Sequence, residues 1–202
     1  WCLGQKPTGG DAINSRTIYA QSGNIIFVDG KNDAFLSTGF PFDINQWQMI
    51  TTTFDGSIVR VYKNGILVGM RAYELFDAIG EVRVASYAWG SENFFVGKFD
   101  EFTVWQGALA PEEILDLIIP DALSAQTANQ QLAWYKMQDP DENSYTIPDH
   151  SGKGNDAELY GYYSPFADWL AQGLRGDCLI FDGGQAVDLP IVVGQAVDYT
   201  VS

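Results

Sequence analysis

The sequence predicts an all-β sandwich with one short helix, and three patterns carry this prediction. Most segments alternate apolar and polar residues with a period of two, which is typical of half-buried strands. Glycine, asparagine and aspartate stand between these segments, where they favour tight turns. Only residues 110–118, "APEEILDLI", look helical, because Pro111 lies near the first turn and Glu112 and Glu113 suit the positive end of a helix dipole.

The expected strands follow one another as hairpins and a meander. Residues 24–38 read as a hairpin around Asp29-Gly30, since Asp-Gly pairs favour two-residue hairpin turns. Residues 47–73 read as a three-stranded meander with turns at Asp55-Gly56 and Asn64-Gly65. Further strands are expected within residues 80–86, 93–105, 132–137, 157–163, 178–184, 185–193 and 197–202.

Composition and charge limit the classes of partner. The chain has 202 residues, 46% of them apolar, which is enough for one large domain with a sizeable core. Eleven basic residues face 26 acidic ones, and the net charge of −15 disfavours nucleic acid and anionic lipid. No stretch approaches the roughly 20 apolar residues of a membrane span, so membrane insertion is not expected. The acidic excess has two interpretations, solubility or divalent cation binding by clustered carboxylates.

Two features of the chain, its cysteines and its first residue, bear on its compartment and its processing. Cys2 and Cys178 lie at opposite ends without Cys-x-x-Cys spacing, which argues against zinc. A disulfide between them, which would need an oxidising compartment, and two buried thiols both remain open. The chain starts at Trp1 rather than Met, so we expect a processed product, an excised piece or a segment of something longer.

The most specific signal is a set of spaced motifs. The set consists of "LAWYKM" (132–137), Asp149-x-Ser151-Gly152-x-x-Asn155, Trp169 with "GDCLIFDGG" (176–184), Trp47 with "TFDG" (53–56), "VYKNGILVG" (61–69) and "GKFDEFTVWQGALAPEEI" (97–114). Together these motifs resemble the laminin-G-like modules of the concanavalin A-like jelly-roll superfamily. The resemblance covers nearly the whole chain and implies a jelly-roll β-sandwich whose closing strand is followed by the short helix.

The order of the motifs is exchanged relative to that family. Residues 1–118 resemble the C-terminal part of a laminin-G-like jelly roll, and residues 132–202 resemble its N-terminal part. Residues 119–131 are small and polar and read as a linker, so the two parts together make one domain equivalent. Joining Ser202 to Trp1 would restore the family order and would run "VDYTVS" into "WCLGQ" as one strand.

Three arrangements would account for this order. The chain is one repeat of a tandem array or filament, a circular permutant, or two half-sandwiches that neighbouring copies complete. An unpaired, apolar chain end invites a partner strand, so we favour head-to-tail assembly with copies of itself. Trp1 and Ser202 are then the predicted junction between subunits or repeats.

The sequence argues against an enzyme. Glucanases of the resembled superfamily carry Glu-x-Asp-x-x-Glu along one strand, and this chain has no such run. Asp100 and Glu101 are neighbours in a predicted strand, so their side chains should point to opposite faces and not form a catalytic pair. His150 is the only histidine and lies in a predicted loop. No catalytic residues are therefore proposed.

A structural Ca²⁺ ion is the one cofactor that the resemblance implies. Its expected ligands are Asp100, Asp149 and Asn155, where the Asp-x-Ser-Gly loop approaches the closing strand. The stretch "DPDEN" (139–143) also has the alternating acids of calcium loops, but it lacks the glycine and the distal glutamate of an EF-hand. The other interpretation is that all these side chains cap turns through hydrogen bonds to the backbone.

Aromatic residues divide into expected packing and expected contact. Tyr87, Trp89, Tyr162 and Tyr163 lie in loops and are the predicted contacts with a glycan or partner, although subunit packing or rim burial is also open. The resemblance places a second set in the core, namely Trp47, Trp105, Trp134 and Trp169.

These observations predict a non-enzymatic structural or adhesive module. It is expected outside the cell or at the cell surface, as a repeat or subunit of a head-to-tail filament or array that serves adhesion. The alternative is a carbohydrate-binding, lectin-like module.

Overall fold

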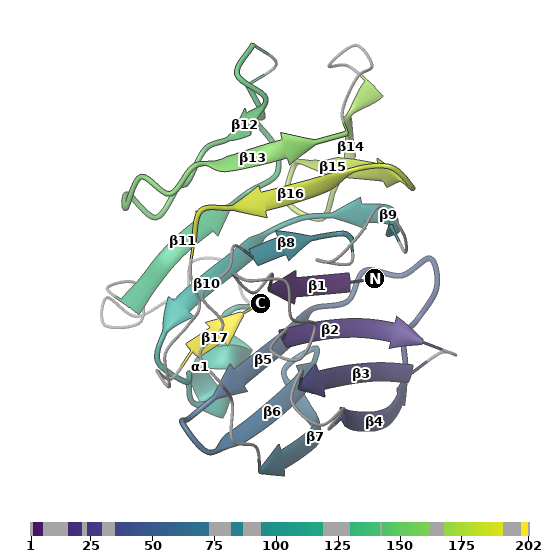
Figure 1. The fold of residues 1–202 in the computed structure, drawn as a ribbon, viewed down its shortest axis with the longest axis vertical. Coiled ribbons are helices and arrows are strands. Elements are labelled where there is room, and N and C mark those ends of the chain that lie inside the picture. Colours follow the sequence, from purple (N-terminus) through teal and green to yellow (C-terminus); the bar gives the residue numbers. More distant parts are fainter. Residues whose placement is uncertain are drawn as a thin grey trace.

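The computed structural model describes most of the chain. The described residues are 2–5, 16–21, 24–29, 35–72, 82–86, 94–118, 130–141, 143–161, 168–191 and 199–201. In these ranges the strands are antiparallel and form two large sheets and one small one, as Figure 1 shows. The structure is therefore the expected all-β sandwich with a short helix.

The larger sheet has eight strands. Their order is β12 (Thr146–Ile147), β13 (Ala157–Tyr160), β16 (Ala186–Leu189), β8 (Val82–Val84), β1 (Cys2–Gln5), β2 (Arg16–Gln21), β3 (Asn24–Asp29) and β4 (Phe35–Pro41). β3 and β4 pair antiparallel as expected, and the residues between them, 30–34, lie outside the described ranges. On the outer face, Arg83 of β8 makes a bidentate ion pair with Asp188 of β16, and both its N···O distances are 2.5 Å.

The second large sheet has six strands, and the small sheet has three. The six are β11 (Gln131–Tyr135), β10 (Phe102–Gln106), β17 (Tyr199–Val201), β5 (Ile50–Phe54), β6 (Ile58–Lys63) and β7 (Ile66–Ala72). The three are β14 (Leu170–Gln172), β15 (Asp177–Asp182) and β9 (Val96–Phe99). The meander β5–β6–β7 has the two turns that the sequence indicated.

The main core lies between the two large sheets, because strands of both contribute to one cluster of buried side chains. Phe54, Val61 and Val104 come from the six-stranded sheet, and Val84 and Leu189 come from the eight-stranded one. Every residue of β5 is buried, which shows that both faces of this strand are covered. One face meets the core, and the other lies on the side of the sheet that carries the helix.

Helix α1 (Pro111–Asp116) covers part of the outer face of the six-stranded sheet. The Glu113 carboxylate accepts a hydrogen bond from the Ala110 N–H at 2.8 Å, which satisfies a backbone donor at the helix start. Ile114 is fully buried against Tyr62 and Trp105 in a second hydrophobic cluster. No helix within the described ranges is long and apolar enough to span a bilayer.

Both parts of the exchanged order contribute to every sheet. Residues 132–202 supply β12, β13 and β16 to the larger sheet, β17 to the second sheet, and β14 and β15 to the small one. The other strands come from residues 1–118, except that β11 begins at Gln131, the last residue of the expected linker. The division into two domain parts stays a prediction, but here one chain supplies both.

The strands nearest the two ends lie in different sheets. β1 pairs with β2 and β8, whereas β17 pairs with β10 and β5, so each has a partner on both sides. This arrangement differs from the single continuous strand that the sequence suggested. It also leaves neither strand as an open edge for a partner. Trp1 and Ser202, the predicted junction, lie outside the described residues.

Candidate functional site

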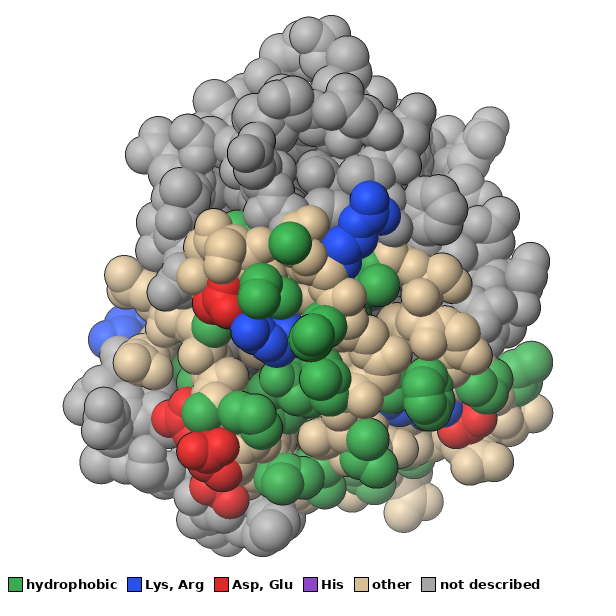
Figure 2. Space-filling view, turned by 90° about the horizontal axis from the view of Figure 1, so that it is seen from below, with side chains coloured by type: hydrophobic (Ala, Val, Ile, Leu, Met, Phe, Trp, Pro, Cys, Tyr) green, Lys and Arg blue, Asp and Glu red, His purple; other side chains and the backbone are tan. Residues whose placement is uncertain are grey.

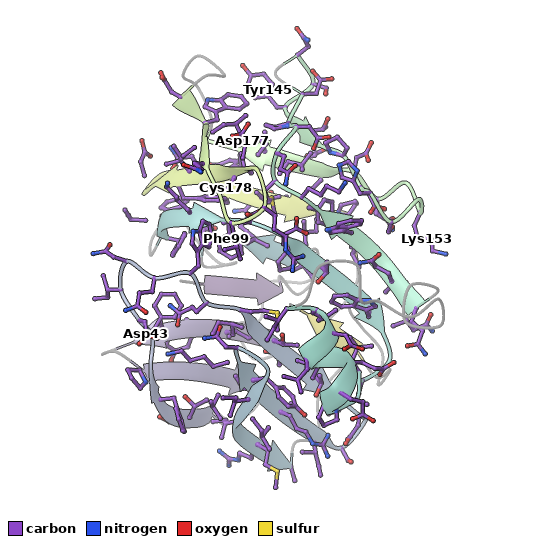
Figure 3. The ribbon with its side chains drawn as sticks, turned by 180° about the vertical axis from the view of Figure 1, so that it is seen from behind. Asp43, Phe99, Tyr145, Lys153, Asp177 and Cys178 are labelled. Carbon is purple, nitrogen blue, oxygen red and sulfur yellow. The ribbon has the colours of Figure 1, made fainter. Side chains whose placement is uncertain are left out.

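An open groove of about 1430 Å³ lies beside the six-stranded sheet, and its lining includes residues from both faces of that sheet. Its lining includes the loop 42–49 between β4 and β5, the β9–β10 bend, the end of α1, β11, and the turn between β14 and β15, together with residues of β2 and β5. Figure 3 views the molecule from behind and labels Asp43 in that loop and Phe99 at the end of β9. Segments far apart in the sequence thus build one surface, which we call the β10 groove.

A backbone bend places two carboxylates in the β10 groove. Glu101 has a φ of +54°, in the left-handed region, and it interrupts the run that the sequence predicted as one strand over 93–105. β9 therefore ends at Phe99 in the small sheet, and β10 starts at Phe102 in the second large sheet. Because the strand is broken, Asp100 and Glu101 both line the groove. The expectation of opposite faces is wrong at this point.

Asp100 anchors the turn between β14 and β15. Its Oδ2 accepts hydrogen bonds from the backbone N–H groups of Leu174 and Arg175 at 2.9 and 3.2 Å. Its Oδ1 is buried and has no hydrogen-bond partner among the residues that the structure describes. Burial raises the pKa of Asp100 above its usual value, although hydrogen bonds from the backbone of Arg175, Leu174 and Glu101 and the charge of Arg175 act in the opposite direction.

Glu101 is held by the indole of Trp134. The Trp134 Nε1–H donates to Glu101 Oε2 at 2.7 Å, and the Lys136 ammonium lies 4.7 Å from the centre of the Trp134 ring. Burial raises the pKa of Glu101, and the neighbouring charge of Asp100 raises it further. Within the described part of the chain, neither carboxylate forms an ion pair.

Arg175 links the floor of the β10 groove, the name we give to the part of its lining with Asp100 and Glu101, to the end of α1. Its Nη2 donates to the carbonyl oxygens of Leu117 and Ile118, each at 3.1 Å. These carbonyls directly follow α1, at the end of a helix where carbonyl groups have no intrahelical donor. The Gln138 side chain donates to the backbone carbonyl of Arg175. The guanidinium of Arg175 is thus occupied by contacts within the protein.

The rim of the β10 groove is apolar and exposed. Its exposed large side chains are Ile44 (81%), Trp47 (41%), Val96 (70%), Ile118 (41%) and Leu174 (64%). The sequence placed Trp47 in the core, and this is wrong, since Trp47 lies in the 42–49 loop. The expectation for Trp105 and Trp169 is confirmed because both are buried, and Trp134 is partly buried. No pattern in the sequence distinguishes Trp47 from the other three.

Several hydrogen bonds fix the 42–49 loop that carries Ile44 and Trp47. The Gln48 side-chain amide accepts from the Asp43 N–H at 3.2 Å and donates to the Asp43 carbonyl oxygen at 2.8 Å. Lys63 Nζ forms an ion pair with Asp43 at 2.8 Å. The Met49 N–H donates to Asn64 Oδ1 at 2.8 Å. This side of the groove is therefore formed before any ligand arrives.

The predicted calcium ligands have other tasks in the structure. Asp149 accepts hydrogen bonds from the backbone N–H groups of Trp134, Ser151 and Asn155, at 2.9 to 3.0 Å. Burial opposes the charge of Asp149, but these bonds outweigh burial and lower its pKa. Asn155 Nδ2 donates to the Leu132 carbonyl at 2.8 Å, which ties the Asp-x-Ser-Gly loop to β11. Asp100 instead holds the β14–β15 turn.

The alternative interpretation of the acids as turn caps agrees with these bonds. In "DPDEN", Asp141 Oδ1 accepts from the Asn143 N–H at 2.8 Å, which closes an Asx turn and lowers the pKa of Asp141. Across the described ranges, no group of three or more His, Cys, Asp and Glu side chains is placed to hold a metal ion. The bound Ca²⁺ stays a prediction.

Other predicted residues are placed only in part. Tyr87, Trp89, Tyr162 and Tyr163, the predicted glycan or partner contacts, lie outside the described residues and stay predictions. Cys178 is a free, buried thiol, so it forms no disulfide with Cys2 in this structure. Burial raises the pKa of this thiol. His150 lies 3.2 Å from the Asp139 carboxylate and meets the Trp134 ring edge-on.

Comparison with known proteins gives one family match. The model for laminin G domains, described as the concanavalin A-like lectin/glucanases superfamily, matches residues 4–115. No curated protein and no solved structure matches the chain. The matched range includes the 42–49 loop, the β9–β10 bend and most of α1, and thus much of the lining of the β10 groove.

Proposed function

Since the chain belongs to the concanavalin A-like lectin/glucanases superfamily, we propose that it is a non-catalytic adhesion module that acts outside the cell and holds its partner in the β10 groove. The superfamily supports a binding or adhesive role. The site is proposed from the groove itself, because fold alone does not place a function.

The observation that carries the proposal is the apolar rim around a polar floor. Exposed Ile44, Val96 and Leu174 stand at the edge of one groove, and the hydrogen-bonded 42–49 loop holds its shape. Contiguous exposed apolar surface with polar groups beside it is typical of an interaction site in soluble proteins. Binding would remove this surface from water at about 25 cal/mol per Å², which favours association.

The same geometry supports a non-catalytic role for the two carboxylates. Asp100 Oδ2 and Glu101 Oε2 each accept hydrogen bonds from N–H groups of the protein itself. A retaining glycosidase instead needs one carboxylate free for attack and one acid that protonates the leaving group. We therefore expect no release of reducing sugar from any polysaccharide. Release that Glu101→Gln abolishes would overturn this part of the proposal.

The adhesion proposal is tested with beads that carry the protein on a panel of matrix proteins, mucins and glycans. We expect one surface to retain the beads, and we expect the double variant Ile44→Ser, Leu174→Ser to reduce retention at least about tenfold. The matched control is Ile66→Ser, Met70→Ser, which removes two equally exposed side chains of β7 outside the groove. Figure 2 shows the hydrophobic side chains at this lower end of the molecule, where β4 and β7 lie. Equal loss in both variants would contradict the proposal.

Carbohydrate binding is the second candidate, and Trp47 is the observation that favours it. A half-exposed indole at the rim of a groove with carboxylates provides a flat apolar face next to hydrogen-bond acceptors. On a glycan array, Trp47→Ala should then remove the signal while Phe40→Ala, an exposed aromatic residue of β4 outside the groove lining, should keep it. Loss on Trp89→Ala alone would move the sugar site to the loop that the sequence predicted.

The proposal also includes head-to-tail assembly of copies of this chain, and fewer observations support this part. Because β1 and β17 are each flanked by two strands of the same chain, assembly would use surfaces and not an exchanged strand. Light scattering at increasing protein concentration tests this, and a constant monomer mass would contradict it.

A further inference from the structure

We infer that the occupant of the β10 groove is a basic segment of a partner protein, with lysine or arginine side chains that alternate with apolar ones. This inference rests on the proposed function and deepens it, because it names the chemistry of the partner. It is argued from the charges on the groove floor and from the kind of side chain on the rim.

The cations that line the β10 groove already have partners. Arg175 donates to two carbonyl oxygens at the end of α1, and Lys136 lies over the Trp134 ring. Lys98 Nζ donates to the Gln172 carbonyl oxygen at 3.2 Å. These three side chains are held by neutral groups and do not form ion pairs with the carboxylates of the floor.

Among the described residues, no cation forms an ion pair with the carboxylates on the floor. Asp100 and Glu101 accept only N–H groups of neutral donors, and Asp100 Oδ1 accepts none from the described residues. The charge of Arg175 acts on both carboxylates and that of Lys136 acts on Glu101, but both cations lie farther from them than ion-pair distance. Burial makes an uncompensated carboxylate unfavourable, so a ligand ammonium or guanidinium that comes close would be bound by charge-assisted hydrogen bonds.

The rim favours a peptide over a sugar. Four of its five exposed large side chains are branched aliphatics, Ile44, Val96, Ile118 and Leu174, and only Trp47 offers a flat ring. Aliphatic side chains gain by burial against other apolar side chains, whereas a hydrated pyranose presents mainly hydroxyl groups. Apolar peptide side chains on the rim and a basic one on the floor would match both parts of the groove.

A second copy of this chain is a poor occupant. It carries 26 acidic residues against 11 basic ones, so the acidic floor repels most segments of a second copy. A partner of the opposite charge gains from the same field. Charge complementarity thus selects a basic partner.

The test uses the whole chain and three labelled peptides, GLKPLKPLG, GLEPLEPLG and GSKPSKPSG, with prolines to keep them extended. Fluorescence anisotropy gives the dissociation constants at low and high salt. We expect GLKPLKPLG to bind at least about tenfold more tightly than either other peptide, with an affinity that falls as salt rises. Equal binding of the acidic or the serine peptide would overturn the inference and leave the proposed groove intact.

Variants separate the groove from general electrostatics. Glu101→Gln should weaken binding of GLKPLKPLG about tenfold, and Glu158→Gln, which removes an exposed carboxylate of β13 outside the groove, should not. Asp116→Asn, at the groove end of α1, is a second variant that leaves the hydrogen bond between Glu101 and Trp134 intact, and it should also weaken binding. Equal effects of Glu101→Gln and Glu158→Gln would overturn the inference.

Two further outcomes distinguish the inference from the function on which it rests. If an oligosaccharide from the array binds and is lost on Trp47→Ala, while no peptide binds, the basic-segment inference is overturned and the groove is a sugar site. If neither peptides nor any surface of the bead panel binds in a groove-dependent manner, the proposed function is overturned together with the inference.

Discussion

At the residue scale, the conformation of Glu101 decides how two adjacent carboxylates are used. In a regular strand Asp100 and Glu101 would face opposite sides, as neighbouring side chains do. The left-handed backbone at Glu101 turns both toward one groove. Each carboxylate then finds local N–H donors, Asp100 in the β14–β15 turn and Glu101 in Trp134. The sequence letters "FDEF" contain no signal for this bend.

The first prediction concerns Gly173, which leaves room for the Asp100 carboxylate. A Cβ at this position would lie 2.7 Å from Asp100 Oδ2 and 2.8 Å from Cys178 Cβ. Gly173→Ala should therefore lower the free energy of unfolding by about 1–3 kcal/mol, as overpacking does. Gly184→Ala is the control, because a Cβ there meets nothing within 4 Å, and its effect should stay within about 0.5 kcal/mol. Urea denaturation measures both, and equal effects would refute the steric explanation.

The second prediction concerns pH. Burial raises the pKa values of Asp100 and Glu101 in the folded state, so their protonated forms stabilise it. The stability that they contribute is complete below the unfolded pKa values and is lost as pH rises through the folded ones. Glu101→Gln should therefore be more stable than the parent at neutral pH, and the difference should shrink in acid. Thermal unfolding of both proteins from acid to neutral pH measures this difference. A stability gain of Glu101→Gln that grows toward acid would contradict the prediction.

The opposite sign holds for the acids that cap turns. Hydrogen bonds lower the pKa values of Asp141 and Asp149, so their contribution is present above the unfolded pKa and is lost as pH falls through the folded pKa. Asp149→Asn should consequently flatten the acid limb of the same pH profile. The two kinds of carboxylate can be told apart in one set of melting curves.

At the element scale, short-range patterns predicted most strands and the helix. The meander β5–β7 follows from Asp-Gly and Asn-Gly turns between alternating runs, and β3 and β4 pair antiparallel as predicted. β2, β12 and β14 were not predicted, and β12 and β14 have only two or three residues, which are too few to show a period. The run 93–105 was predicted as one strand and is two, since β9 pairs with β15 while β10 pairs with β11.

Helix α1 gives the third prediction. Its six residues are too few for a helix to be stable by itself, so it should depend on the contact of Ile114 with Tyr62 and Trp105. Ile114→Ala should lower the free energy of unfolding by about 2–5 kcal/mol. Leu115→Ala, one position along and largely exposed, should cost at most about 1 kcal/mol. Comparable losses in chemical denaturation would show that the helix is held by something other than its buried face.

At the scale of the whole molecule, the two parts of the chain interleave. β10 from the first part lies between β11 and β17 of the second, and β15 from the second pairs with β9 of the first. Separation would expose the core faces and open the edges of all three sheets. The exchanged order of the motifs is therefore compatible with one cooperative sandwich.

The fourth prediction follows from this interleaving. A protease site introduced within residues 119–129 should allow cleavage without dissociation, because paired strands and the shared core still join the fragments. The cleaved protein should elute from a sizing column at the mass of the intact chain and should melt in one transition. Two separate fragments after cleavage would show that residues 1–118 and 132–202 do not complete each other in one molecule.

The sequence alone determined the class of fold, the positions of most strands and the family, because alternation, turn residues and spaced motifs are local. It also singled out the Asp-x-Ser-Gly loop, in which Asp149 accepts hydrogen bonds from the backbone N–H groups of Ser151 and Asn155, although the expected Ca²⁺ stays a prediction. Only the tertiary structure decided that Trp47 is exposed, that Asp100 and Glu101 share a groove, and that β1 and β17 lie in different sheets. Those properties depend on pairing between segments distant in the chain, and neither the period nor the composition of a single segment carries that information.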